Sequence, residues 1–108
     1  MVDALHEENI DPSEISHVVV SHLHFDHAGG LTTLNKDCPV PTFPNAAVHV
    51  QAQEWADANQ NRAVMTRTYL PTHLEPIVSQ VKTHTEASTI LEGLTVASAP
   101  GHTWGQQA

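Results

Sequence analysis

Residues 22–27, HLHFDH, place three histidines and one aspartate within six positions, directly after the β-branched run HVVVS at 17–21. We expect this run to form a short buried strand. The histidine cluster would then lie at the carboxyl end of a strand, where open α/β sheets usually place their functional sites. The position of the cluster therefore predicts a site at a sheet edge.

The spacing inside the cluster indicates metal binding. His22 and His24 are two positions apart, so on extended backbone they project to the same side and can bind one ion. Asp26 and His27 come after the strand has turned, which lets them point to a second position nearby. Imidazole suits zinc, iron, manganese or nickel, and a carboxylate adds negative charge for a second ion. A catalytic ion needs at least three protein ligands, so another ligand must come from elsewhere in the chain.

The segment PGHTWG at 100–105 supplies that candidate. His102 is flanked by a proline and glycines and follows a predicted strand at 94–98. A histidine in a tight loop at a strand end is well placed to be a rigid ligand. Thr103 is expected to fix the loop through hydrogen bonds of the Ser/Thr-turn kind.

Composition limits the architecture and the partners. The chain has 108 residues, which predicts a single small domain over 1–108. Hydrophobic residues make up 40% and charged residues 15%, as in globular proteins. A net charge of −8 argues against nucleic-acid and anionic-membrane partners.

Cys38 is the single cysteine, so no internal disulfide can form, and it is expected to be an inert thiol. The sequence shows neither a signal peptide nor a long apolar run, so we expect a cytoplasmic location.

Turn and periodicity signals suggest a mixed order of short helices and strands. The expected elements are a weak helix at 2–9, a capped turn at 11–15, a helix opening in LTTLN at 31–35, a proline-rich loop at 36–45, a strand at 46–50, a helix at 51–62 with Ala52, Trp55 and Ala56 on one side, an indistinct stretch at 63–76, and strands at 77–85 and 88–99 with a turn at Glu92 and Gly93.

Two motifs carry a family resemblance. HLHFDH resembles the HxHxDH signature of the metallo-β-lactamase-fold hydrolases, and PGHT resembles the loop that carries the next ligand of that superfamily. The stretch FPNAAVHVQAQEWADA at 43–58 is similar to the lactonase-like branch. The resemblance implies an α+β fold that forms part of a four-layer αββα sandwich.

The resemblance also implies a site and a reaction. His22, His24 and His102 would hold a first ion, and Asp26 and His27 would begin a second site. The expected cofactor is zinc, as one or two ions, with iron or manganese as alternatives. In that family a metal-bound hydroxide attacks an ester, lactone, thioester, amide or phosphate bond of a small-molecule substrate. We expect this hydrolase activity of the complete protein, of which the 108 residues form a part. Asp26 would be catalytic by orienting the hydroxide or moving its proton.

The sequence also departs from the family pattern. A bridging aspartate and a further histidine normally follow the PGHT loop, and hairpins normally precede the first motif; neither is found here. We therefore expect a partial domain, incomplete at both ends, whose uncovered sheet face favours a homodimer. A phosphodiesterase or nuclease of the same fold, and a non-catalytic metal-binding fragment, remain alternatives. His73 is a candidate for lining a substrate cleft, whereas His6, His17, His49 and His84 are expected to be ordinary surface or strand residues.

Overall fold

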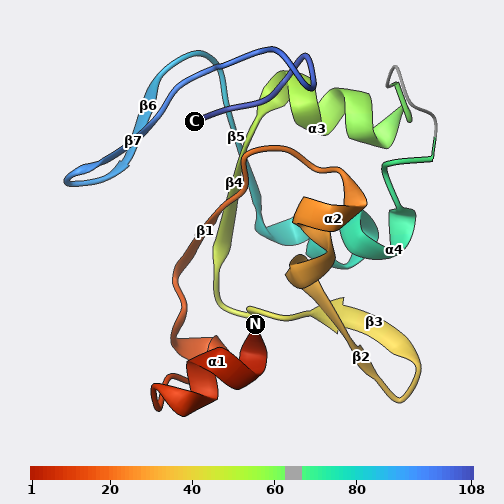
Figure 1. The fold of residues 1–108 in the computed structure, drawn as a ribbon, viewed down its shortest axis with the longest axis vertical. Coiled ribbons are helices and arrows are strands. Elements are labelled where there is room, and N and C mark those ends of the chain that lie inside the picture. The colour runs from red at the N-terminus through yellow and green to blue at the C-terminus, as the bar shows by residue number, and fades with distance from the viewer. Residues whose placement is uncertain (63–66) are drawn as a thin grey trace.

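A three-stranded parallel sheet forms the centre of the molecule. The computed structural model describes residues 1–62 and 67–108. The strands β1 (His17–Val19), β4 (Ala47–Gln51) and β5 (Val81–His84) lie in the order β1-β4-β5. Figure 1 shows them in the middle of the view, with α2 (Phe25–Ala28), α3 (Ala52–Asn59) and α4 (Pro71–Leu74) on one side. The carboxyl ends of β1 and β4 therefore meet at one edge of the sheet.

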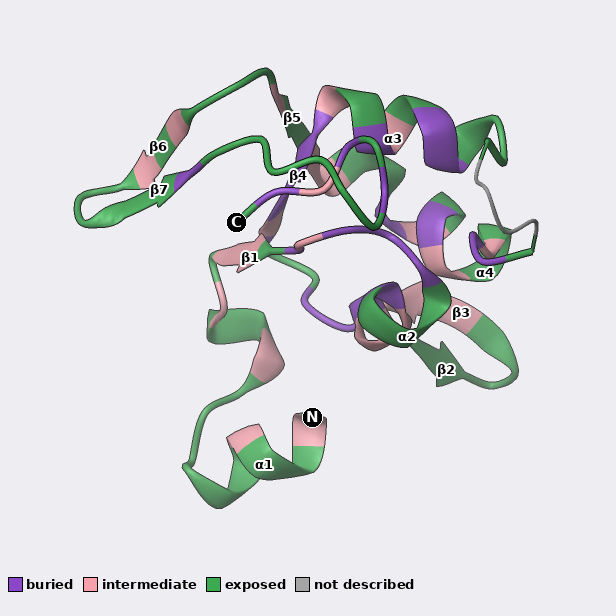
Figure 2. Ribbon diagram, turned by 45° about the horizontal axis from the view of Figure 1, so that its top comes forward, coloured by how far each residue is buried: buried purple, intermediate pink, exposed green. Residues whose placement is uncertain are grey.

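The core lies between the sheet and these helices. Val48 and Val50 lie on one face of β4 and belong to this core, because alternate side chains of a strand point to the same face. The residues on the other face, His49 and Gln51, are buried as well. Figure 2 shows the buried residues gathered around β4, α3 and the chain between β1 and α2. The buried cluster consists of Val20, Leu23, Ala28, Leu31, Val48, Val50, Ala58, Tyr69, Leu74 and Ile77.

The N-terminal elements confirm two predictions. Helix α1 (Val2–Glu7) forms where a weak helix was expected, and none of its residues is buried. The capped turn appears as the 3-10 helix η1 (Pro12–Glu14). Asp11 caps it, since its side chain accepts from the Ser13 amide while its own amide donates to Glu14.

The prediction of a helix at 31–35 is wrong, and the predicted loop at 36–45 is interrupted by a strand at 38–41. The 3-10 helix η2 (Gly29–Leu31) is followed by a hairpin of β2 (Thr32–Asn35) and β3 (Cys38–Pro41), in place of the expected helix and loop. The φ angles of Lys36 and Asp37 are 49° and 66°, as a two-residue hairpin turn requires. The prolines are accommodated because a two-stranded sheet leaves outward-facing positions that need no N–H donor.

Two further expectations need correction. Strand β1 is buried only in part, because it lies at the edge of the three-stranded sheet and Val19 is 39% exposed. On α3 the buried side chains are Glu54, Asp57 and Ala58, whereas Ala56 is exposed and Trp55 is half-buried. The helix therefore turns two carboxylates inward where an apolar face was expected.

The C-terminal half follows the prediction more closely. The strand expected at 77–85 begins later, because residues up to Gln80 belong to the 3-10 helix η3 (Glu75–Gln80). Strands β6 (Ser88–Leu91) and β7 (Leu94–Val96) form the expected hairpin, with a φ of 82° at Gly93. Part of the indistinct stretch, 63–66, lies outside the described residues. Among the helices described, none is long and apolar enough to cross a membrane.

Candidate metal centre

Three histidines from two distant segments converge beyond the carboxyl end of β1. His22 and His24 lie between β1 and α2, and His102 lies on the loop after β7. Each offers one ligand nitrogen, and the three nitrogens lie within 4.8 Å of one another. The first two residues are buried and His102 is exposed, so the group is held from inside and open on one side. An open side is what a catalytic metal site needs for water or substrate.

The hydrogen bonds around these rings leave nitrogens for a ligand. The Ser21 hydroxyl lies 3.1 Å from Nδ1 of His22, which orients that ring. Among the described residues, no partner satisfies the buried Nε2 atoms of His22 and His24. A buried polar atom without a partner costs free energy. The donor set therefore fits a divalent cation, which would satisfy these nitrogens.

Burial sets the protonation state of the two inner rings. Burial, with the neighbouring His27 and His24, lowers the pKa of His22. Burial, with the neighbouring His102, lowers the pKa of His24 in the same way. The neutral imidazole, which is the form that binds metals, is therefore favoured at neutral pH.

A second group of metal-capable side chains shares His22. Ligand atoms of His22, Asp26 and His27 also lie within 4.8 Å of one another. The rings of His22 and His27 have centroids 4.0 Å apart, and Nε2 of His27 lies 3.8 Å from Oδ2 of Asp26. Asp26 and His27 are exposed residues of α2. The structure thus brings together all five predicted site residues, in two groups that meet at one ring.

Glu54 is a residue of the site that sequence reasoning missed. Its carboxylate is fully buried and accepts hydrogen bonds from the Leu23 amide, the Tyr69 hydroxyl and the Thr103 hydroxyl. Thr103 was expected to bond within its own loop, but its hydroxyl donates to Glu54 instead. The available signal was the place of Glu54 just after β4, at the same sheet edge as the histidines.

The C-terminal residues fix the His102 loop to the sheet. The Gln107 amide donates to the Ser21 carbonyl at 2.9 Å, and its buried side chain donates to the carbonyls of Val20 and His49. Gln51 in turn donates to the Gln107 side chain at 3.0 Å. These bonds hold the segment after His102 against the strand that leads to His22.

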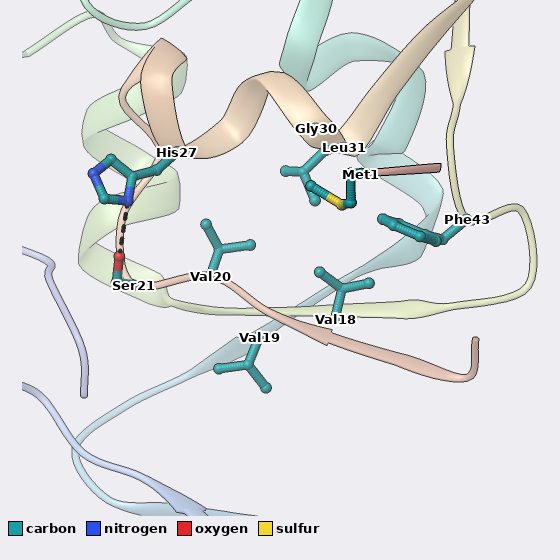
Figure 3. A pocket seen from close by; sticks show the side chains of 9 residues that line it. All are labelled: Met1, Val18, Val19, Val20, Ser21, His27, Gly30, Leu31 and Phe43. Carbon is teal, nitrogen blue, oxygen red and sulfur yellow. Dashed lines mark hydrogen bonds between the residues drawn. The ribbon is translucent and has the colours of Figure 1, made fainter. Parts of the chain in front are cut away.

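An apolar cavity of about 420 Å³ adjoins the second group. Figure 3 shows Ser21 and His27 at one end and the side chains of Val18, Val20, Leu31, Phe43 and Met1 along its walls. The volume falls within the range of small-molecule pockets, about 300–1,000 Å³. His73 does not line this cavity; its ring lies beside Gly29, where it would be 3.5 Å from an added Cβ.

Three further histidines form a row across the sheet. Nδ1 of His17 lies 2.9 Å from Nε2 of His49, and Nδ1 of His49 lies 2.8 Å from Nε2 of His84. Both ring pairs are stacked. The expectation of ordinary strand residues is therefore incomplete, because His49 is buried and bonded on both sides.

The fold and the two motifs agree with one family. The model of the metallo-β-lactamase superfamily matches residues 2–106, and the chain belongs to this superfamily. The predicted family and mixed fold class are thereby confirmed.

Individual relatives narrow the comparison. An N-acyl homoserine lactonase of Bacillus thuringiensis is 29% identical over all 108 residues, which cover 37% of that protein. A probable metal-dependent hydrolase from Staphylococcus aureus matches with a TM-score of 0.86 and 25% identity, over 98% of this chain and 37% of that one. An N-acyl homoserine lactone hydrolase, with N-hexanoyl-L-homoserine bound at its catalytic metal center, matches with a TM-score of 0.69 and 27% identity, over 98% and 36% of the two chains. The chain thus spans little more than a third of each.

Proposed function

We propose that this protein is a metal-dependent hydrolase of small-molecule esters or lactones, in which His22, His24 and His102 hold a divalent cation. The observation that carries the proposal is the convergence of these three side chains, whose ligand nitrogens lie within 4.8 Å. The buried, unpartnered Nε2 atoms of His22 and His24 support it further. An all-nitrogen set suits zinc, and iron or manganese can also bind such ligands.

Asp26 and His27, with the shared His22, form the place for a second ion. Divalent cations at such sites supply Lewis acidity, which activates water at neutral pH and polarises a substrate oxygen. The role of Asp26 follows from its position. Asp26 is exposed, and it belongs to the second group of metal-capable side chains, which shares His22 with the first group. It is therefore the carboxylate best placed to accept a proton from the attacking water.

In lactone hydrolysis the water oxygen forms a bond to the carbonyl carbon, and the bond from this carbon to the ring oxygen breaks. Asp26 would take the proton from the water and return it to the ring oxygen as that oxygen leaves. The apolar cavity beside His27 offers a place for the hydrocarbon part of the substrate. The relatives named as N-acyl homoserine lactonases favour a lactone. The net charge of −8 disfavours a polyanionic phosphodiester.

The test compares two probes on the zinc-loaded chain and its Asp26→Asn variant. We expect turnover of N-hexanoyl homoserine lactone above that of a phosphodiester chromophore, and a loss in kcat of about 100-fold or more in the variant. Faster hydrolysis of the phosphodiester would overturn the substrate class. Bound metal without turnover of either probe would support the alternative of a non-catalytic metal-binding fragment.

A further inference from the structure

We propose that Glu54 is the positioning residue of the metal centre, because its buried carboxylate joins the segment of His22 and His24 to the segment of His102. The link would set the spacing of the three rings before any cation binds. The inference rests on the proposed function, in that it concerns the same site.

The two contacts that make the link come from the two ligand-bearing segments. The Leu23 amide donates to Oε1 of Glu54 at 2.8 Å, and Leu23 stands between His22 and His24. The Thr103 hydroxyl donates to Oε2 of the same carboxylate at 2.6 Å, and Thr103 directly follows His102. Each oxygen of one side chain therefore holds one segment.

A third donor completes the environment of the carboxylate. The Tyr69 hydroxyl donates to Oε1 at 3.2 Å, and the Tyr69 ring lies with its centroid 5.1 Å from that of His24. Burial and the nearby Glu54 raise the pKa of Tyr69, so this phenol stays protonated and able to donate. A buried carboxylate is costly unless hydrogen bonds satisfy it, and three donors meet that condition here.

Backbone packing also fixes the position of the loop with His102 relative to Glu54. A Cβ atom added at Gly105 would overlap the backbone nitrogen and Cα of Glu54, so the loop lies directly on α3. Helix α3 begins immediately after β4, the middle strand of the sheet. Glu54 therefore projects from a rigid part of the fold, which is where precise sites are built.

The charge of Glu54 would act in the same direction as its hydrogen bonds. Glu54 interacts electrostatically with both His22 and His24, and its negative charge favours a cation at their unpartnered nitrogens. Groups that orient metal ligands without touching the metal typically change its affinity by about 10–100-fold when they are removed.

The experiment measures the zinc dissociation constant by chelator competition for the 108-residue chain and four variants. Glu54→Gln keeps the shape and loses the charge, and Thr103→Val keeps the shape and loses the donor. We expect each to weaken zinc binding about 10-fold or more, and Thr103→Ser to restore it. Asp57→Asn is the matched control, since Asp57 is also buried on α3 but bonds to Gln53; its affinity should stay within about twofold.

A metal-free readout separates this proposal from the proposed function. In Glu54→Ala, hydrogen exchange at the Leu23 amide should rise about tenfold or more, while exchange at the Val50 amide of β4 stays unchanged. Unchanged exchange at Leu23, an equal rise at Val50, or zinc affinities of Glu54→Gln and Thr103→Val within twofold of the unaltered chain would each overturn the positioning role. If the unaltered chain binds no zinc, the proposed function fails, and the exchange result alone decides for or against Glu54.

Discussion

Nδ1 of His24 lies 3.1 Å from Nε2 of His102, although 78 positions separate the two residues. The two rings lie close together because both segments are held at the same end of the sheet. His24 comes after β1, and the segment with His102 is bonded back to the end of that strand through Gln107 and Ser21. The metal centre is thus a property of the tertiary fold, and its integrity can be tested through residues that hold the two segments together.

Gly105 offers the sharpest steric test. Gly105→Ala should lower the free energy of unfolding by about 1–3 kcal/mol, because the added Cβ would overlap the backbone of Glu54. Gly101→Ala in the same loop is the control, since among the described residues nothing lies within 4 Å of an added Cβ there. It should change stability by less than about 0.5 kcal/mol. Urea denaturation checks both, and equal effects would show that the loop does not press on α3.

Gln107 provides a test through hydrogen bonds. Gln107→Ala removes the side-chain donor to the buried Val20 carbonyl and one of two acceptors of the Gln51 side-chain amide, which also donates to the Glu86 carbonyl. Loss of a buried hydrogen-bond partner of this kind should cost about 1–3 kcal/mol. Gln106→Ala next to it should cost less, because the Gln106 residue is only half-buried. Thermal or urea unfolding of the two variants compares them; similar losses would argue that Gln107 does not hold the loop.

Acid should destabilise the metal-free chain. Burial, with His84, His17 and Lys82 close by, lowers the pKa of His49 below its ordinary value of 6.5. The unfolded chain therefore binds a proton at a higher pH than the folded chain does. The contribution of His49 to the free energy of unfolding should therefore stay constant above about pH 6.5. It should fall as the pH drops from about 6.5 toward the pKa of His49 in the folded chain.

Urea denaturation from about pH 8 to about pH 5.5 measures the slope of the free energy of unfolding against pH. His49→Gln should make this slope shallower, whatever its effect on stability at neutral pH, and the slope that remains comes from His22 and His24, whose pKa values burial also lowers. His6→Gln, at an exposed position on α1, serves as the control and should leave the slope as it is. A chain that becomes more stable on acidification would contradict the expectation.

The site residues were predictable because their spacing is local. The sequence alone shows two histidines at alternate positions and a third in a glycine-flanked loop. The predicted strand before each of these segments indicates the sheet edge at which the histidines lie. The five predicted residues do lie in two adjoining groups. Their roles as ligands stay a prediction until metal is measured.

Other parts depend on contacts that short windows do not contain. A glutamate in a helix usually faces water. Glu54 is buried here, and its carboxylate is satisfied in part by the hydroxyl of Thr103, which is 49 positions away. The row of His17, His49 and His84 depends on the register of three strands. The hairpin at Lys36 and Asp37 was missed because two left-handed residues in a row are set by strand pairing as much as by residue type.

The metal content of the purified chain tests the central claim most directly. Plasma mass spectrometry should find about one zinc, iron or manganese per chain at the first group, or about two if the second group also fills. A His22→Ala/His102→Ala variant should lose the metal, while His6→Ala should retain it. Full metal in the double variant, or none in a folded unaltered chain, would contradict the metal centre assigned to His22, His24 and His102.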